Sequence, residues 1–506
     1  MKICIVTTEY PPGPMGGVGT YNMEMTKLLV AAGHSVTLIT KWHDGAPSVE
    51  NNNGVVVYRL KPLNEISGEL VWHDRDLHTN EMIHLRSYTG VFARRVADLL
   101  PVLHAKHGFD VILTQDVEAP MHLLQTRRML FNELHDVPIA LFVHSPHNQC
   151  EFYNDASIYS RWAYHRCVYE AESIAMADGL IAASEFMKQM VADDMGYPLD
   201  RIAVIPCPMG EVPSPYPFEQ RVGSDGSNHR LIVYAGRIEI RKGVETLIRA
   251  VVPLLKENPC LCVRLYGRDC KHRALGDSVT EHLQKRLIPP ELNPRIEFAG
   301  SLDRNALWAE YGRATVGVVP SRWEPFGLVC QEMMASGTPV VATSAGGMAE
   351  MIQDGESGIL CAEDNVPALQ TALRKALDAA PATRRQWGDN AARRIRSFCD
   401  NGRIVKETIA YLENLKTKQR AAWKQAGRFS VPSNLPFGDV PLSAPHPALR
   451  HGTPAPVNKL AVVVPCYNMG TYLDACMKSL LAQERRPDRI YVVNDGSNDP
   501  ETLTAL

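Results

Sequence analysis

Short apolar runs alternate with helically spaced apolar residues over the first part of the chain. The runs predict buried strands at 2–8, 34–40, 55–60, 110–114, 138–144, 179–183 and 201–206. Apolar residues at helical spacing predict helices at 18–32, 81–106 and 164–177. Strands and helices in alternation form parallel crossover units, so we expect a doubly wound, Rossmann-like domain over residues 1–212.

The same alternation restarts beyond a segment rich in Pro, Gly, Ser and Asn at 211–229, which is typical of a linker. Strands are expected at 231–235, 262–266, 295–299, 315–320 and 340–343, with a strand and helix across 360–379. They predict a second doubly wound domain over 213–399, facing the first across a cleft. A last helix is expected at 400–415.

The chain beyond this helix has a different character. Residues 416–457 carry many prolines, which predicts a partly extended linker. Residues 458–506 then show a strand, a helix and a strand. One crossover unit of this length is too small to bury a core, so we expect an incomplete α/β unit belonging to a longer protein.

The polar loop 321–327 joins the strand 315–320 to a helix at 328–335. It places the amides of Phe326, Gly327 and Leu328 at a helix N-terminus, where anions and hydroxyl oxygens are favoured. Glu324 lies in this loop, and Glu332 lies more than one turn into the helix. Because ligands bind at the carboxyl ends of parallel strands, the loop is a candidate site. Each glutamate alone is equally well explained as a helix-start or surface carboxylate.

Glycines crowd the turn after the first strand, at Gly13, Gly16, Gly17 and Gly19. A dinucleotide fingerprint also needs an acidic residue at the end of the second strand to hold the ribose. Lys41 and Trp42 stand there instead, which argues against an NAD site. The remaining alternatives are a ligand-binding loop and a flexible turn.

Five further residues follow strands in the predicted domains. Arg237 and Lys242 lie on a strand-to-helix loop, where they could pair with a diphosphate or simply be solvated. His144 ends its strand at the edge where active sites form, although it could also be a satisfied structural histidine. Asp116 and His147 are weaker candidates.

Composition narrows the function classes. The net charge is −3, so a strongly basic nucleic-acid surface is not indicated. The 12 cysteines form no CxxC pair and mostly lie in apolar runs such as those of Cys4, Cys262 and Cys330, which indicates reduced, buried thiols in a cytoplasmic protein. The first residues form a strand and not a secretion signal, and no uncharged run approaches the ~18 residues of a membrane span.

Peripheral contact with a membrane remains open. The predicted helix at 81–106 carries Arg86, Arg94 and Arg95, which could touch acidic lipid headgroups. Packing of this helix on the sheet is the more ordinary explanation. Asp74-Arg75-Asp76 has the DxD form of metal-dependent sugar transferases, but it lies in a charged stretch and is interpreted as solvated surface.

The run EPFGLVCQE, followed by SGTPVVAT and GGMAEMI, resembles the family 4 glycosyltransferases, and the resemblance spans residues 2–415. It implies the GT-B fold, in which two Rossmann-like halves face a cleft. It also implies a retaining hexosyltransferase that moves a sugar from a nucleotide-sugar to an acceptor hydroxyl, with no metal and no cofactor besides the donor. The acceptor would be a carbohydrate or a lipid-linked molecule.

The resemblance also assigns roles. Arg237 and Lys242 would offset charge on the leaving diphosphate, Glu324 would hold the sugar, and His144 would lie near the anomeric carbon. Donor binding would involve Gly16 and Gly17 at the phosphate, Gly267 and the loop of Leu302 at the nucleotide, the amides of Phe326, Gly327 and Leu328 at the sugar, and Glu332 at the ribose. The family commonly has a second glycine two residues after Gly267, where this chain has Asp269.

The segment 458–506 resembles the opening unit of a family 2 glycosyltransferase, which has the different GT-A fold, and Asp495 would contact its nucleotide. Two transferases in one chain suggest synthesis of surface polysaccharide or glycoconjugates. The alternatives are a catalytically silent nucleotide-binding scaffold and a nucleotide-sugar epimerase. Base and sugar contacts in such sites are largely backbone and shape, so the sequence names neither the donor nor the acceptor.

Overall fold

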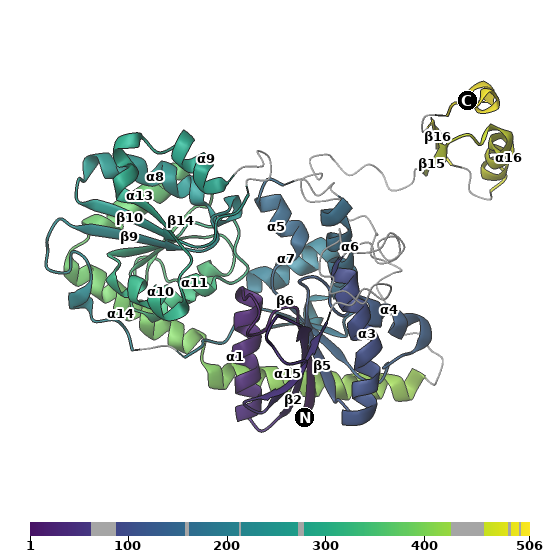
Figure 1. The fold of residues 1–506 in the computed structure, drawn as a ribbon, viewed down its shortest axis with the longest axis horizontal. Helices are drawn as coiled ribbons and strands as arrows, with labels where there is room; N and C mark the ends of the chain where they lie inside the picture. The colour runs from purple at the N-terminus through teal and green to yellow at the C-terminus, as the bar shows by residue number, and fades with distance from the viewer. Residues whose placement is uncertain are drawn as a thin grey trace. The chain divides into compact units, whose positions relative to one another are not determined.

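The computed structural model describes residues 1–61, 88–156, 161–211, 214–271, 278–426, 460–483, 487–494 and 497–505. They form two compact units, Met1–Leu442 and Ser443–Leu506 (Figure 1). The first unit contains two doubly wound sheets, which confirms the predicted fold class. The DxD segment 74–76, Arg86 and Asp495 lie outside the described residues.

The first half is built on an eight-stranded sheet in the order β3-β4-β2-β1-β5-β6-β7-β8. Its strands are β1 (Lys2–Val6), β2 (Ser35–Lys41), β3 (Val49–Asn52), β4 (Val55–Leu60), β5 (Val111–Gln115), β6 (Ile139–Val143), β7 (Gly179–Ala182) and β8 (Ile202–Val204). All neighbours are parallel except β3 and β4. The strand order reverses beside β1, so the carboxyl ends of β1 and β5 mark the switch point where ligands bind.

Helices cover both faces of this sheet, as the two-residue period of the strands requires. They are α1 (Gly17–Ala31), α3 (Tyr88–His107), α4 (His122–Phe131), α5 (His147–Tyr153), α6 (Arg161–Ala175) and α7 (Glu185–Met195). On one face, α1 packs on Ile3 and Ile5. On the other face, α3 packs on Cys4 and Val6. This is the ordinary packing that we expected for the helix at 81–106, which begins in the described residues at Tyr88.

The second half has a six-stranded, fully parallel sheet in the order β11-β10-β9-β12-β13-β14. Its strands are β9 (Arg230–Ala235), β10 (Leu261–Tyr266), β11 (Ile296–Gly300), β12 (Val316–Val319), β13 (Val340–Thr343) and β14 (Ile359–Cys361). Its helices are α8 (Val244–Glu257), α9 (Val279–Arg286), α10 (Arg304–Arg313), α11 (Leu328–Ala335), α12 (Met348–Met351), α13 (Val366–Asp378) and α14 (Pro381–Phe398).

The two halves share an apolar core. One cluster of buried side chains runs from Met25 and Ile205 of the first half through Cys207 to Cys330 and Met333 of the second. Burial of apolar side chains is the dominant favourable term in folding, so this continuity favours joint packing of the halves. Asn401 adds two hydrogen bonds where the chain crosses between the halves. Its side chain accepts from the N–H of Met209 and donates to the carbonyl of Met209.

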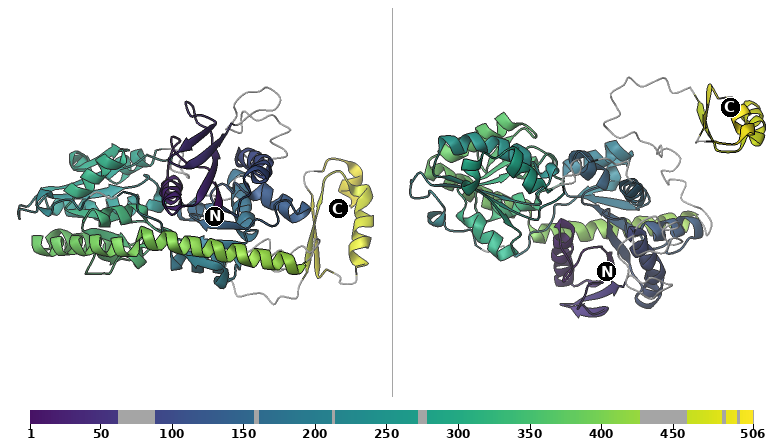
Figure 2. Two further views of the ribbon diagram at one scale, coloured as in Figure 1. Left: turned by 90° about the horizontal axis from the view of Figure 1, so that it is seen from below. Right: turned by 45° about the horizontal axis from the view of Figure 1, so that its top comes forward.

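The long helix α15 (Asn401–Ala426) crosses back onto the first half (Figure 2). The hydroxyl of Tyr411 donates to the carbonyl of Arg201 at 3.2 Å, and Lys416 pairs with Asp110. A Cβ on Gly179 of β7 would lie 2.2 Å from the Tyr411 hydroxyl, so a glycine makes room for this contact. The sequence predicted a helix ending at residue 415, and α15 continues to Ala426.

The second unit contains two parallel strands, β15 (Ala461–Cys466) and β16 (Arg489–Asn494), with α16 (Gly470–Leu481) and α17 (Pro500–Ala505). Val463, Tyr472 and Tyr491 are exposed, whereas Cys466 and Leu473 are its buried apolar residues among those described. The unit is therefore a small α/β unit with the strand, helix and strand that the sequence predicted. Within the described parts of the chain, no helix combines the length and apolarity needed to span a membrane.

Candidate active site

The loops after β9 and β12 bring Lys242 and Glu324 together. These strands are parallel neighbours, so both loops leave the same edge of the sheet. A Cβ on Gly243, which has φ +68°, would lie 1.8 Å from the carbonyl oxygen of Pro320, so glycine permits the close approach of the two loops. Lys242 Nζ pairs with Glu324 Oε2, and the Ser321 hydroxyl donates to the same oxygen at 3.2 Å.

Burial and neighbouring charge set the ionisation of this pair. The side chains of Lys242 and Glu324 are only 18% and 12% exposed. Burial opposes ionisation of Glu324, but the positive charges of Lys242 and Arg241 outweigh it and lower its pKa. Burial, reinforced by Arg241, lowers the pKa of Lys242, and Glu324 limits that shift. The site therefore holds an ionised carboxylate against a cation that is partly desolvated.

Arg241 is a member of this cluster that the sequence reasoning missed. It is buried, donates to the carbonyl of Trp323 at 3.2 Å and lies 5.6 Å from the centre of the Trp323 ring. Its guanidinium also bonds Glu239, which in turn pairs with Arg237 at 3.1 Å. Arg237 is 49% exposed, so it can reach a ligand while Arg241 supports the loop. The signal for Arg241 was its place beside Lys242 in a short basic loop.

The loop that carries Glu324 is closed by backbone contacts. Gly327 has φ +102° and immediately precedes α11, whose N-terminal amides follow it. Cβ atoms on Gly346 and Gly347 would lie 2.1 Å and 2.6 Å from the carbonyl oxygens of Glu324 and Pro325. The paired glycines of the GGMAEMI run thus fit directly against this loop, which places Phe326, Gly327 and Leu328 at the start of α11 as predicted.

Three residues were predicted to bind the nucleotide. Gly267 and Leu302 follow two other strands at the same edge of the sheet, and Glu332 lies in α11. Gly267 follows β10 with φ +148°, and a Cβ there would lie 1.8 Å from the Gly236 oxygen. Leu302 lies just beyond β11 and is 40% exposed. Glu332 is 18% exposed, and burial raises its pKa, opposed by Arg304. Asp269, which replaces the family's glycine, accepts from Thr280 N at 3.1 Å and so supports the start of α9.

The glycine loop of the first half meets α11 of the second. A Cβ on Gly17 would lie 3.3 Å from Leu328 Cδ1, so the starts of α1 and α11 are neighbours. The carboxylate of Glu9 accepts from Gly16 N at 2.7 Å and from Gly19 N at 3.0 Å. Glu9 therefore fills part of the anion-binding end of α1, a role that the sequence reasoning did not assign.

His144 follows β6 in the first half, and its ring packs against Phe142 at 4.5 Å and Tyr21 at 4.9 Å. Burial lowers its pKa to about 3, so the imidazole is neutral. Its Nε2 atom is buried without a hydrogen-bond partner among the described residues. A buried, unpaired ring nitrogen carries an energetic cost, which is the usual mark of a ligand-binding or water-binding position.

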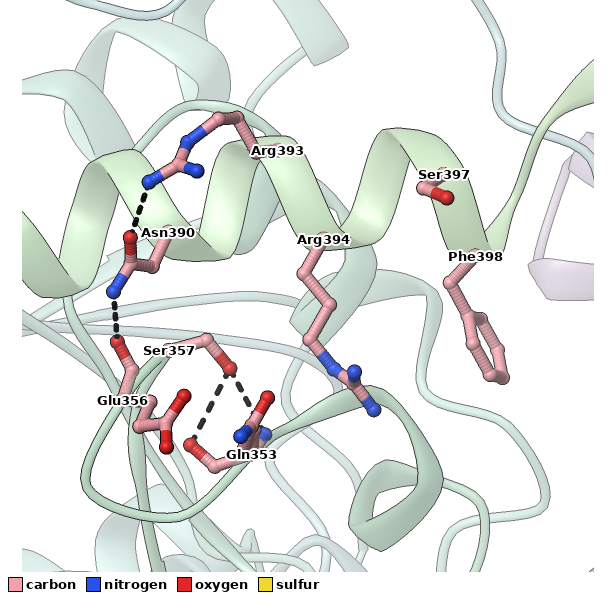
Figure 3. A pocket seen from close by; sticks show the side chains of 8 residues that line it. All are labelled: Gln353, Glu356, Ser357, Asn390, Arg393, Arg394, Ser397 and Phe398. Carbon is pink, nitrogen blue, oxygen red and sulfur yellow. Dashed lines mark hydrogen bonds between the residues drawn. The ribbon is translucent and has the colours of Figure 1, made fainter.

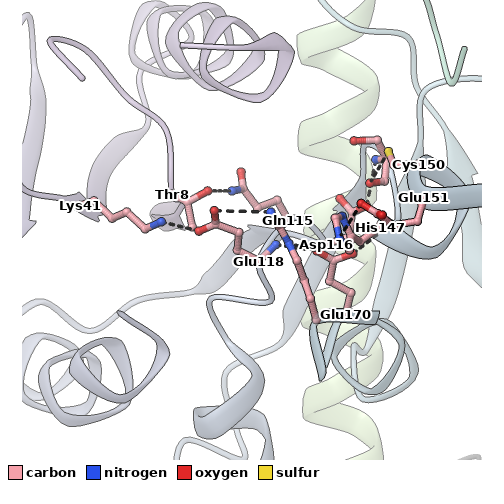
Figure 4. A network of polar contacts seen from close by, with 11 residues as sticks. Thr8, Lys41, Gln115, Asp116, Glu118, His147, Cys150, Glu151 and Glu170 are labelled. Carbon is pink, nitrogen blue, oxygen red and sulfur yellow. Dashed lines mark hydrogen bonds and ion pairs between the residues drawn. The ribbon is translucent and has the colours of Figure 1, made fainter. Parts of the chain in front are cut away.

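A network of buried carboxyl groups supports the loop of His144 (Figure 4). Asp116 accepts from the backbone N–H of His144 at 2.8 Å and of Ser145 at 2.9 Å, and burial raises its pKa to about 6. Glu170 accepts from His147 N and Glu118 N at 2.6 Å and 2.9 Å. Burial raises the pKa of Glu170 to about 8. Asp116 and Glu170 thus hold the loops that follow β5 and β6.

A surface pocket of about 450 Å³ lies elsewhere in the second half (Figure 3). It is lined mainly by α14 residues such as Asn390, Arg393 and Arg394, and by Gln353 and Glu356 of the segment after α12. None of the predicted site residues lines it. Over the described ranges, no three His, Cys, Asp or Glu side chains are grouped as a metal site would require.

Comparison with known families agrees with this geometry. The model of "Glycosyltransferase Family 4" matches residues 15–209, and the model of "Glycosyl transferases group 1" matches residues 218–394. The first unit belongs to the family 4 glycosyltransferases. The model of "Glycosyl transferase family 2" matches residues 461–505 in the second unit. The chain is thus a GT-B glycosyltransferase followed by a short segment that matches the family 2 glycosyltransferases.

Relatives of this glycosyltransferase span most of the chain. The glycogen synthase of Mycobacterium tuberculosis is 28% identical over 398 residues, which cover 76% of this chain and 88% of the relative. Sucrose-phosphate synthase of Thermosynechococcus elongatus superposes with a TM-score of 0.62 at 22% identity, covering 83% of this chain and 100% of the other. Anabaena HepE, solved with UDP and glucose, superposes with a TM-score of 0.58 at 17% identity, covering 82% and 99%. The two structural similarities show the GT-B fold.

Proposed function

We propose that the first unit is a retaining, metal-independent glycosyltransferase that moves a hexosyl group from a nucleotide-sugar to an acceptor hydroxyl. The observation that carries this proposal is the Lys242–Glu324 pair, which lies beside Arg237 and the start of α11 at one edge of the second sheet. Cations and helix amides at this edge suit an anionic leaving group, and the start of α1 faces them from the other half.

The basic groups would act on the leaving nucleoside diphosphate. Charge on its terminal phosphate grows as the glycosidic bond breaks, so fixed cations stabilise the transition state more than the ground state. Lys242 is held in place by Glu324, and Arg237 is exposed enough to bind the diphosphate with its planar fork. These two side chains would supply the charge that a metal ion supplies in other transferases.

The sugar would lie between the two halves' loops. Glu324 and the amides of residues 326–328 would bind its hydroxyls, while the neutral His144 offers its unpaired Nε2 from the first half. Lys242 and Ser321 both hold Oε2 of Glu324, and we assign no nucleophile to the described residues. This arrangement favours attack by the acceptor hydroxyl on the face that the leaving group departs, with retention of configuration.

The acceptor would be a carbohydrate or a lipid-linked molecule, in the synthesis of a surface polysaccharide or glycoconjugate. Support for this is the family itself and the presence of a family 2 segment in the same chain. The HepE structure with UDP and glucose and the starch synthase IV structure of Arabidopsis thaliana with ADP and acarbose make UDP- and ADP-linked sugars the first donors to test.

The test begins with thermal stabilisation of the protein by UDP, ADP, GDP and their sugars, because a ligand that binds the native state raises its melting temperature. The stabilising nucleotide-sugar is then incubated with simple glycosides, with and without EDTA, and the product is examined by NMR. Transfer with the donor's anomeric configuration, unaffected by EDTA, is expected. Inverted product or dependence on a metal would contradict the mechanism. Donor isomerisation without an acceptor would indicate an epimerase, and binding without turnover a silent scaffold.

A further inference from the structure

Arg304 lies between two carboxylates that come from different halves of the first unit. It is the first residue of α10, directly after Asp303, whose side chain accepts from Ala306 N and caps the helix. Arg304 Nε lies 3.6 Å from Glu332 Oε1, and its Nη1 lies 3.6 Å from Glu24 Oε1. The side chain is 36% exposed, so it is partly withdrawn from solvent between these partners.

The backbone where the chain crosses between halves leaves room for this bridge. A Cβ on Gly210 would lie 2.3 Å from Arg304 Nη1 and 2.7 Å from Glu24 Oε1. Any larger residue at that position would displace the guanidinium or the carboxylate. Glu24 itself is buried on α1 and also pairs with Lys27 at 3.4 Å. The crossing at Gly210, α1 and α10 therefore meet around the Arg304 side chain.

The contacts of Glu332 within the protein determine how many hydrogen bonds its carboxylate can still accept from a ligand. The Tyr311 hydroxyl donates to Oε2 at 3.4 Å, and Arg304 lies on the side of Oε1. An ionised carboxylate has about four lone-pair positions, two on each oxygen. Each oxygen thus keeps at least one position free, which suits a pair of vicinal hydroxyl groups that donate one hydrogen bond each.

We propose that Arg304 is a positioning residue for the donor's ribose, and that its bridge to Glu24 links ribose binding to the placement of α1. This inference rests on the proposed function, in which Glu332 accepts from the ribose hydroxyls. Arg304 orients the Glu332 carboxylate and keeps its charge. The same guanidinium holds α1, whose first residue Gly17 lies beside Leu328 at the proposed sugar-binding loop.

Loss of Arg304 has two physical consequences. Glu332 loses the cation beside Oε1, so its orientation and ionisation are no longer maintained. Glu24 and Glu332 are then left as like charges on facing halves, which disfavours the arrangement that brings α1 to α11. Both effects weaken binding of a nucleotide that has ribose hydroxyls. Neither acts on Arg237 and Lys242, which would hold the diphosphate, although the second effect also shifts the start of α1 with Gly16 and Gly17.

The experiment measures binding of UDP, ADP and GDP by calorimetry to the full chain and to Arg304→Gln, Arg304→Lys, Glu24→Gln and the Arg304→Gln/Glu24→Gln double variant. The nucleotide that binds the parent is then compared with its 2′,3′-dideoxy form. Arg313→Gln is the matched control, because Arg313 lies on the same helix, is 54% exposed and pairs with Glu310 of its own helix. Circular dichroism and melting temperature verify that each variant is folded.

Arg304→Gln is expected to weaken binding of the ribonucleotide roughly tenfold, a size ordinary for coupled charged groups in contact. It should weaken binding of the dideoxy nucleotide clearly less than binding of the ribonucleotide, and Arg304→Lys should restore part of the loss. Glu24→Gln should give a smaller loss, and the double variant should be no weaker than Arg304→Gln. The control should match the parent.

Equal losses for the ribonucleotide and the dideoxy nucleotide would overturn the proposal, because Arg304 would then have a purely structural role. An unchanged affinity in Arg304→Gln would do so as well. Strictly additive effects of Arg304→Gln and Glu24→Gln would refute the bridge between halves. Failure of the proposed function is a separate result, since the parent itself would then bind none of the three nucleotides.

Discussion

Replacement of Lys242 by alanine gives the sharpest test of the catalytic proposal. Lys242 Nζ is fixed by Glu324, next to Arg241, in a loop that Gly243 lets approach Pro320. Removing one preorganised group that faces a developing negative charge typically lowers kcat by about 10²- to 10³-fold, or ~3–4 kcal/mol. The loss in affinity for the nucleoside diphosphate should be no more than about tenfold, since Arg237 and the α11 amides remain.

The same substitution has a stability cost that can be separated from catalysis. Removing one partner of a fully buried ion pair costs about 3–5 kcal/mol. Here Ser321 and Arg241 still stabilise the Glu324 carboxylate and both side chains keep some exposure, so about 2 kcal/mol is expected. The double variant Lys242→Ala/Glu324→Gln should unfold at a higher temperature than Lys242→Ala, because it has no buried Glu324 carboxylate left without its lysine partner.

The assay is initial-rate transfer at saturating donor, with nucleotide affinity measured by calorimetry on the same preparations. Lys256→Ala is the matched control, since Lys256 is an exposed residue near the end of α8. A kcat for folded Lys242→Ala within about threefold of the parent would refute the assigned role of leaving-group stabilisation. A loss confined to nucleotide affinity would show that Lys242 binds donor and transition state equally.

Three further predictions concern other parts of the molecule. Glu332→Ala should weaken nucleoside diphosphate binding about tenfold with a smaller effect on kcat, because ribose contacts exist in ground and transition states alike; calorimetry and initial rates measure the two effects. The pKa of Glu170 is raised from 4.5 to about 8, so it contributes stability below about pH 4.5 that is lost as the pH rises through about 8. Glu170→Gln should therefore show a smaller fall in melting temperature between about pH 5 and about pH 8 than the parent does; an equal fall would contradict the shift. Deletion of residues 459–506 should leave transfer by the first unit intact and raise the monomer fraction in light scattering, because that unit exposes Val463, Tyr472 and Tyr491; a large loss of activity in the folded deletion would place the tail in the first enzyme.

The sequence predicted the elements that local physics controls. Helix α11 and strand β13 have the predicted bounds, because an apolar period, Gly337 and Pro339 delimit them without help from the rest of the fold. Ser184 caps α7, with its hydroxyl accepting from Met187 N, which is a contact within one helical turn. Where the pattern was weak the prediction failed. The polar edge strand β3 was missed, α15 ran past its expected end, and Cys262 is exposed instead of buried.

Some residues of the candidate site could likewise be proposed from the sequence, whereas others were found only in the tertiary structure. The resemblance to the family 4 glycosyltransferases proposed Lys242, Glu324 and Glu332 as site residues, and chain order alone places the first two in loops at the carboxyl ends of strands. The residues that contact this site from distant parts of the chain could not be identified from the sequence. Arg304 joins Glu24 to Glu332, and Ser184 donates to Pro325 of the other half at 2.8 Å. Such pairings depend on how two sheets pack, and a charge's partner is decided by distance in space rather than by spacing along the chain.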